Sequence, residues 1–303
     1  MRVFLTGATG FIGSHILPEL LEAGHQVLGL TRSDAGARAL AAAGAEAHLG
    51  TLEDTDSLRE GAARADAVIH TAFDHDFSNF AANCEKDGRA IAALGSALKG
   101  TDRPILITSA VGMGATGPGE AAREDVFDAH HPSPRIASER AGAALSAEGV
   151  NVSVIRLPQV HDTAKQGLVS PYIELSKAKG VAAYVGDGLN RWSAAHVVDV
   201  ARLYRLAMEK AQPGTRYHAS AEEGVPVREI AEVVSAGLGV PTVSLSPQEA
   251  GEHFGWLALF AGWDMLTSSA WTRKALGWEP RGPGLIADLR NMDYSVVGAA
   301  HGA

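Results

Sequence analysis

The chain of 303 residues contains a single cysteine, Cys84, so no disulfide can form within it. Small secreted domains that depend on disulfides carry several cysteines, and their absence here favours a reducing, cytoplasmic compartment. No run of Lys or Arg stands out, and the formal net charge is −9 at pH 7. Because nucleic acids and anionic membranes attract cationic surfaces, we expect neither as a partner.

Long apolar runs are also missing from the sequence. No uninterrupted stretch approaches the roughly 20 residues that span a bilayer. The N-terminal residues 1–5 lead straight into glycines, which leaves no room for the apolar region of a signal peptide. We therefore expect a cytoplasmic protein with no membrane partner, acting on a small-molecule substrate.

Short β-branched apolar segments alternate with longer Ala-rich segments over the first 160 residues. This alternation is typical of βαβ units and predicts an α/β fold, a doubly wound parallel (Rossmann) sheet covered by helices on both faces. Hydrophobic residues make up 46% of the chain and charged residues 20%, which fits a compact enzyme. Strands are predicted at 3–5, 26–30, 45–49, 67–70, 105–108 and 152–156, and helices at 14–23, 35–43, 56–62, 80–98 and 138–148.

The regular alternation ends near residue 160, where prolines and glycines interrupt the chain. We expect residues 1–160 to form the dinucleotide-binding domain, with 195–220 returning to it as a helix and a strand near Tyr217. Residues 161–194 and 221–303 would form a smaller C-terminal substrate lobe. A helix-like run at 249–265 carries several aromatic side chains, which would build either the core of this lobe or a substrate pocket.

A glycine-rich segment, Thr-Gly-Ala-Thr-Gly-Phe-Ile-Gly at 6–13, lies between the first predicted strand and the first predicted helix. In this context the first glycine permits a tight turn, the second lets the backbone approach a pyrophosphate, and the third allows close helix packing. The helix N-terminus offers unpaired N–H groups and a positive dipole end to the anion. The residues expected to contact the cofactor here are Gly7, Thr9, Gly10, Phe11, Ile12 and Gly13.

The end of the second predicted strand indicates which dinucleotide is bound. A site selective for NAD usually carries an acid there for the ribose 2′-hydroxyl, but this chain has Arg32 followed by Ser33. A guanidinium can pair bidentately with a 2′-phosphate, so we expect NADP(H) to be preferred over NAD(H). Asp34 would weaken this preference, and a solvated surface role for Arg32 is the alternative.

Several segments resemble the extended and atypical short-chain dehydrogenase/reductase families, which include NAD-dependent epimerases/dehydratases and 3β-hydroxysteroid-dehydrogenase-like proteins. Besides the glycine turn, the matching segments are 66–70, 105–109, 156–158 and 190–201. The resemblance implies that the loop after the fourth strand lies along the cofactor and that the segment after the sixth borders the nicotinamide. It also hints at a homodimer. The residues so implicated are Thr71, Ala72, Phe73, Pro158 and Val160.

The chain departs from these families at the catalytic residues. They normally use a Tyr-x-x-x-Lys pair, but the family pattern places Arg135 at the tyrosine position and Glu139 at the lysine position. The active-site hydroxyl falls on Ser109 in one register and on Ala110 in another. Arg135 would stabilise an oxyanion, held by Glu139 one helical turn away; an ordinary surface ion pair is the alternative.

A histidine is a candidate substitute for the missing proton donor. His161 follows the sixth strand near the expected nicotinamide site, so it is a candidate proton donor, with a packing role as the alternative. The cluster at 74–76 (Asp-His-Asp) has no second group at a zinc-site spacing, and no metal is expected.

These features together predict an NADPH-dependent reductase of a carbonyl or imine on a medium-sized apolar substrate, with an acid other than tyrosine. The nicotinamide carries the hydride, so the protein need only orient it and stabilise charge on the acceptor. Two alternatives stay open: a nonenzymatic NADP(H)-binding sensor or regulator, and a redox-neutral epimerase or lyase.

Overall fold

The computed structural model describes residues 1–117 and 119–298, and its centre is a seven-stranded parallel sheet. The strand order is β10-β6-β5-β4-β1-β2-β3, with every neighbouring pair parallel. The order reverses between β1 and β4, the point at which ligands bind in doubly wound sheets. The predicted fold class is thus confirmed. The strands are β1 (Arg2–Thr6), β2 (Gln26–Thr31), β3 (Glu46–Leu49), β4 (Ala67–His70), β5 (Pro104–Ala110), β6 (Asn151–Leu157) and β10 (Arg216–His218).

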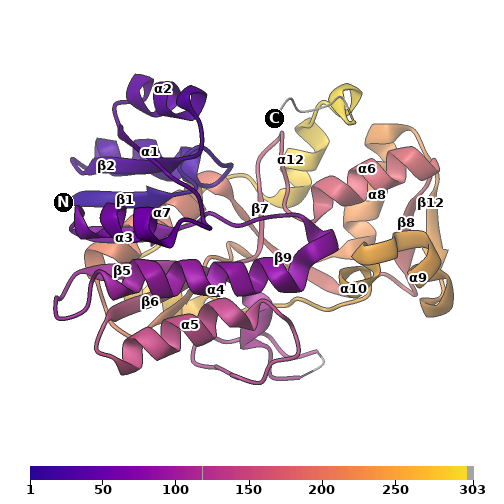
Figure 1. The fold of residues 1–303 in the computed structure, drawn as a ribbon. Coiled ribbons are helices and arrows are strands. Elements are labelled where there is room, and N and C mark those ends of the chain that lie inside the picture. Colours follow the sequence, from indigo (N-terminus) through magenta and orange to yellow (C-terminus); the bar gives the residue numbers. More distant parts are fainter. Residues whose placement is uncertain (118, 299–303) are drawn as a thin grey trace.

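Helices cover both faces of this sheet, because successive strand residues point to opposite sides. In β1, Val3 and Leu5 join one buried cluster while Phe4 joins another. The first cluster packs under α1 (Gly13–Glu22), α2 (Asp34–Ala42) and α7 (Val197–Lys210). The second packs under α3 (Thr55–Ala63), α4 (Phe80–Ser96) and α5 (Ile136–Ala147), and Figure 1 shows α4 and α5 running side by side.

A second core lies beside the main sheet, at the right of Figure 1. Its strands are β7 (Gln159–His161), β9 (Arg191–His196) and β11 (Glu222–Pro226) in one small sheet, and β8 (Ala182–Val185) and β12 (Thr242–Leu245) in another. Its helices are α6 (Val169–Lys179), α8 (Val227–Leu238), α9 (Pro247–Phe254), α10 (Ala258–Ala261) and α12 (Leu285–Asn291). We refer to this part as the smaller lobe.

Short helices complete the fold: η1 (Phe77–Asn79), η2 (Val111–Gly114), η3 (Gly255–Leu257), α11 (Ala270–Leu276) and η4 (Tyr294–Val296). Within residues 1–117 and 119–298, no helix has the length and apolar character needed to cross a membrane.

Two features of the C-terminal half differ from the sequence-based predictions. The helix-like run at 249–265 is broken: α9 ends before Gly255, whose φ of 56° lies in the left-handed region, and only α10 and a 3-10 turn follow. The buried Trp278 packs into the main core instead of the smaller lobe, and its indole N–H donates to the Asp199 carbonyl at 2.9 Å. Part of 221–303 therefore returns to the dinucleotide-binding side.

Candidate cofactor and active site

The glycine turn between β1 and α1 is built for close backbone packing. Gly7 has φ of 70°, and a Cβ there would lie 2.8 Å from the Ala72 backbone nitrogen. A Cβ on Gly13 would lie 2.0 Å from the Gly7 carbonyl oxygen, whereas one on Gly10 would meet only that oxygen, at 3.2 Å. Gly7 and Gly13 are thus required by the protein itself, while the space in front of Gly10 is open to a ligand.

The start of α1 offers the donors that a diphosphate needs. Its N-cap residue, Ile12, provides no side-chain cap, so no side chain competes with an anion for the positive dipole end of the helix. The turn is tied to the loop after β4, because Thr71 donates from its hydroxyl to the Thr6 carbonyl at 2.8 Å and the Ala72 N–H donates to the Thr6 hydroxyl at 3.3 Å. These residues fit the diphosphate of a nicotinamide dinucleotide.

The carboxyl end of β2 presents Arg32 to solvent, and no ion pair engages it in the described part of the chain. The Ser33 hydroxyl instead caps α2, accepting from the Gly36 N–H at 3.2 Å. The Gly50 N–H donates to the Thr31 carbonyl, which brings the residues after β3 to the same edge of the sheet. The half-buried Leu52 lies at this edge, next to the end of β2, because β3 neighbours β2 in the sheet. The sequence-based prediction did not include this residue in the site.

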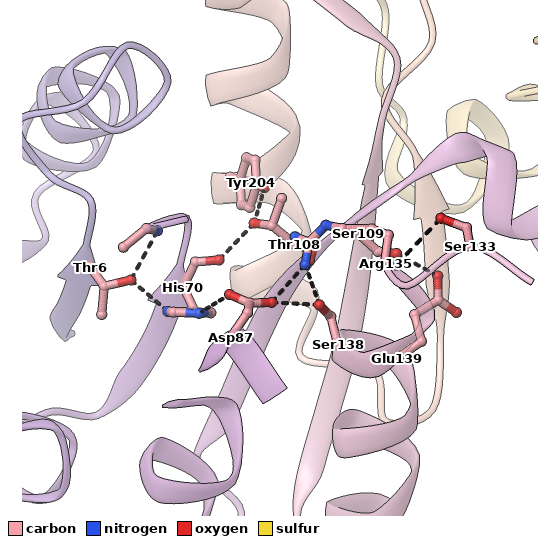
Figure 2. Close-up of polar contacts among 11 residues, drawn as sticks. Thr6, His70, Asp87, Thr108, Ser109, Ser133, Arg135, Ser138, Glu139 and Tyr204 are labelled. Carbon is pink, nitrogen blue, oxygen red and sulfur yellow. Dashed lines mark hydrogen bonds and ion pairs between the residues drawn. The ribbon is translucent and has the colours of Figure 1, made fainter. Parts of the chain in front are cut away.

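Arg135 lies at the start of α5 and is held by residues from other elements (Figure 2). It donates to the Asp87 carboxylate of α4 at 2.7 Å, to the Thr108 carbonyl of β5 at 2.8 Å, and to the Ser138 hydroxyl. Its guanidinium lies 4.4 Å from the centre of the Phe73 ring. The predicted Arg135–Glu139 pair is therefore wrong, because a buried carboxylate on α4 takes the place of the one on α5.

A buried chain of hydrogen bonds connects the glycine turn to Arg135 (Figure 2). The Thr6 hydroxyl lies 2.7 Å from His70 Nδ1, and His70 Nε2 lies 3.0 Å from Asp87. Burial alone would raise the pKa of Asp87, but the Arg135 charge and the His70 and Ser138 hydrogen bonds hold it well below the ordinary value. Asp87 thus stays an anion that fixes Arg135 at the far end of this chain of hydrogen bonds.

Glu139 points into the protein and forms a fully buried pair with Arg156 of β6. Arg156 donates from Nε to Glu139 Oε1 and from Nη2 to Glu139 Oε2, both at 2.8 Å. The Ser109 hydroxyl donates to Oε1 of the same carboxylate at 2.8 Å. Burial would raise the pKa of Glu139, but the Arg156 hydrogen bonds and charge lower it. The predicted catalytic hydroxyl and carboxylate therefore bind each other on the α5 side of the sheet.

Arg156 extends this buried network to the loop that precedes α5. Its remaining N–H groups donate to the backbone carbonyls of Arg123 at 3.1 Å and Val126 at 2.8 Å. Its Nη1 also lies 3.2 Å from His218 Nε2 on the edge strand β10. Glu139 and Arg156 thus position β6, β10 and the loop around residue 125 from one buried point.

In the segment that was predicted to border the nicotinamide, Pro158 is half-buried, Val160 is buried, and His161 of β7 is fully buried. Its Nδ1 lies 2.7 Å from the Asp288 carboxylate, and its Nε2 has no hydrogen-bond partner. Burial lowers the pKa of His161 despite the hydrogen bond to Asp288. The neutral imidazole is favoured here, in a place that solvent does not reach.

Aromatic side chains of the loop after β4 meet the smaller lobe. Phe77 stacks on Trp256 with ring centroids 4.5 Å apart, and Phe73 lies 6.3 Å from Phe80. Trp263 reaches the carboxyl end of β5, where its indole would lie 3.4 Å from a Cβ on Gly112. Aromatic rings thus line the loop after β4 and the carboxyl end of β5, with Phe73 against Arg135. Their sequence spacing alone had left their role undecided between core and pocket.

A cavity of about 940 Å³ opens at the β10 edge, bordered by Arg123, Arg216 and Trp271, and none of the predicted cofactor residues lines it. Among residues 1–117 and 119–298, no three His, Cys, Asp or Glu side chains are grouped so that they could hold a metal ion. The glycine turn at the strand-order reversal remains the best-defined candidate site.

Comparison with known proteins gave matches over nearly the whole chain. The model of the NAD dependent epimerase/dehydratase family matches residues 3–219. An uncharacterized protein of Schizosaccharomyces pombe is 45% identical over 97% of this chain and 100% of its own. The 2-alkyl-3-oxoalkanoate reductase of Stenotrophomonas maltophilia is 28% identical over 80% of this chain and 77% of its own. UDP-glucose 4-epimerase of Thermus thermophilus, solved with NAD, has a TM-score of 0.75 at 22% identity, covering 99% of this chain and 100% of that one.

Proposed function

This chain belongs to the NAD dependent epimerase/dehydratase family, and on that premise we propose that it is an NADPH-dependent reductase. Its substrate is a carbonyl or imine compound of medium size and apolar character. The observation that carries the proposal is a set of aromatic rings that follow β4 and β5: Phe73, which lies against Arg135, and Trp263, which lies beside Gly112. We call these two rings the aromatic wall. The name of the Stenotrophomonas maltophilia relative describes reduction of a 3-oxoalkanoate, a ketone, which supports the reaction class.

The glycine turn and Arg32 would bind the two ends of the phosphorylated cofactor. The α1 N-terminus and the open space before Gly10 suit the diphosphate, and Arg32, which has no ion-pair partner in the described chain, suits a 2′-phosphate. When bound, the nicotinamide supplies the hydride. The other parts of the predicted site, from the loop after β4 to Val160, would orient the nicotinamide.

Arg135 would stabilise the negative charge that develops on the substrate oxygen or nitrogen. A guanidinium has five N–H donors, and three of them serve Asp87, Ser138 and Thr108. Two donors are left for an oxyanion, and the buried carboxylate prevents the side chain from moving away. Because Glu139, Ser109 and His161 are engaged elsewhere, an activated acceptor that demands little acid catalysis fits this site best.

The cofactor proposal predicts selective stabilisation by NADPH. Titrating the protein with NADPH and NADH in a thermal-shift assay should give the larger rise in Tm with NADPH, because ligand binding stabilises only the folded state. Arg32→Ala should remove the difference between the cofactors, while Arg59→Ala, which changes an exposed arginine on α3, should keep it. A chain that responds to neither cofactor would contradict the proposal.

The reductase proposal predicts NADPH oxidation with a panel of ketones, imines and quinones. Arg135→Lys keeps a positive charge for Asp87 but removes the free guanidinium donors, so kcat should fall on the order of 100-fold, as for loss of an oxyanion donor. Cofactor affinity should stay unchanged. Unaltered kcat in this variant would remove Arg135 from the reaction.

A nonenzymatic NADP(H) sensor is the second candidate, favoured by one specific observation. Ser109, Glu139 and His161 are all buried and hydrogen-bonded to protein groups instead of facing the aromatic wall. Selective NADPH binding with no turnover on the whole substrate panel would favour the sensor over the reductase.

A further inference from the structure

The loop between β7 and α6 contains Lys165, whose backbone is held in place by hydrogen bonds of Asp162 and Gln166. The Asp162 carboxylate accepts from the N–H groups of Ala164 and Lys165, both at 2.7 Å, and the Asp162 N–H donates to the Lys165 carbonyl at 2.9 Å. The fully buried Gln166 side chain donates to the Asp162 carbonyl at 3.0 Å. The backbone of Lys165 is therefore fixed, while its side chain is exposed.

The Lys165 ammonium reaches across to the glycine turn of the main sheet. Its Nζ lies 5.9 Å from the centre of the Phe11 ring, and Phe11 follows Gly10 at the open face of that turn. No carboxylate pairs with Lys165 in residues 1–117 and 119–298. The nearest acid in sequence, Asp162, is occupied by backbone N–H groups.

The loop after β4 lies within reach of the same positive charge. His75, in the loop after β4, has its pKa lowered first by desolvation and then by the positive charges of Lys165 and Arg135. The neighbouring Asp74 is taken by Lys86 at 2.7 Å. Positive charge thus gathers beside the glycine turn in a chain whose formal net charge is −9, which favours an anionic ligand there.

We propose that Lys165 is a cofactor-binding residue, whose ammonium pairs with the cofactor diphosphate from the smaller lobe while the α1 N-terminus binds it from the main sheet. The inference rests on the proposed cofactor site. The diphosphate is favoured over an anionic substrate group because Phe11 adjoins the helix N–H groups that would bind the diphosphate itself. Lys165 thereby couples the two lobes through the bound cofactor.

The test measures cofactor dissociation constants by fluorescence titration for Lys165→Gln, Lys165→Arg and the control Lys179→Gln. Lys179 is an exposed lysine of the same lobe, at the end of α6. Lys165→Gln should weaken NADPH and NADH binding equally, by about tenfold at low salt and less at high salt, because the ion pair is screened. Lys165→Arg should stay within about threefold of the wild type, and Lys179→Gln should match it.

A probe without a diphosphate locates the contact. Reduced nicotinamide riboside carries neither phosphate of the diphosphate, so Lys165→Gln should bind it as the wild type does. Unchanged NADPH affinity, a changed ratio of NADPH to NADH affinity, or an effect confined to substrate KM would each overturn the inference. Wild-type protein that binds neither dinucleotide would overturn the proposed function as well, whereas tight wild-type binding with no effect of Lys165→Gln refutes the lysine alone.

Discussion

At the residue scale, His218 shows how a buried network fixes the state of one side chain. Its Nδ1 lies 2.9 Å from the Ser268 carbonyl oxygen, which accepts only, so Nδ1 carries the proton. Its Nε2 lies 3.2 Å from Arg156 Nη1, which donates only, so Nε2 is unprotonated. Burial, followed by the Arg156 charge, lowers the pKa of His218 to about 4. The folded protein therefore holds His218 in its neutral form.

This state predicts a loss of stability in mild acid. The unfolded chain binds a proton near the ordinary pKa of about 6.5, so between pH 6.5 and pH 4 it binds more protons at this site than the folded chain. The free energy of unfolding should fall by on the order of 1–2 kcal/mol between pH 7 and pH 5 from His218 alone. Urea unfolding at several pH values measures this slope.

Two variants isolate the His218 contribution. His218→Gln removes the titrating group and should flatten the slope in that range, whereas His130→Gln changes a fully solvated histidine and should leave the slope unaltered. Equal slopes in all three proteins would show that His218 is not the group that titrates.

At the element scale, the buried Glu139–Arg156 pair holds α5, β6 and the edge strand β10 together. Removing one partner of a buried ion pair leaves an uncompensated charge in the interior. Glu139→Gln should therefore lower the free energy of unfolding by about 3 kcal/mol, measured by urea denaturation. Arg216, whose Nε lies 3.1 Å from Glu139, would lose its partner as well.

The same helix supplies a matched control. Glu148 caps the C-terminus of α5 and pairs with Lys99 at 2.7 Å on the surface, where an ion pair contributes at most about 1 kcal/mol. Glu148→Gln should thus change stability little. If the two variants cost the same, Glu139 does not hold these elements together.

The elements of the main sheet were predictable because each is encoded locally. Alternating apolar strands and Ala-rich helices located β1 to β6 and α1 to α5, and the glycine turn was identified by its position between the first strand and helix. The partners of Arg135 and Glu139 were not predictable. Asp87 and Arg156 come from α4 and β6, and only the packing of α5 against both brings them into reach.

Gly255 explains why the helix predicted at 249–265 in the smaller lobe is broken. Residues 249–265 carry aromatic side chains at helical spacing, but the backbone at Gly255 takes a left-handed φ that a continuing helix excludes. Trp256 consequently turns back toward Phe77 and stacks on it. The spacing of the aromatic residues predicted one helix, whereas the positive φ at Gly255 ends α9 and redirects the backbone.

At the scale of the whole molecule, the two cores share elements. β9 gives Trp192 and Ala194 to the core of the smaller lobe and Ala195 to the main core. Trp278, far along the chain, returns to the main core and donates to the Asp199 carbonyl of α7. Because the chain crosses between the cores several times, neither can unfold without exposing buried surface of the other.

This shared construction predicts one cooperative unfolding transition. Tryptophan fluorescence reports on Trp192, Trp256 and Trp263 near the smaller lobe and on Trp271 and Trp278 at the main core. Far-UV circular dichroism reports on all helices, including those of the main sheet. The two urea curves should coincide, and saturating NADPH should shift both together. A fluorescence transition at lower urea than the circular dichroism transition would mean that the smaller lobe unfolds by itself. A shift of only one of the two curves with NADPH would mean that the cofactor contacts only one lobe.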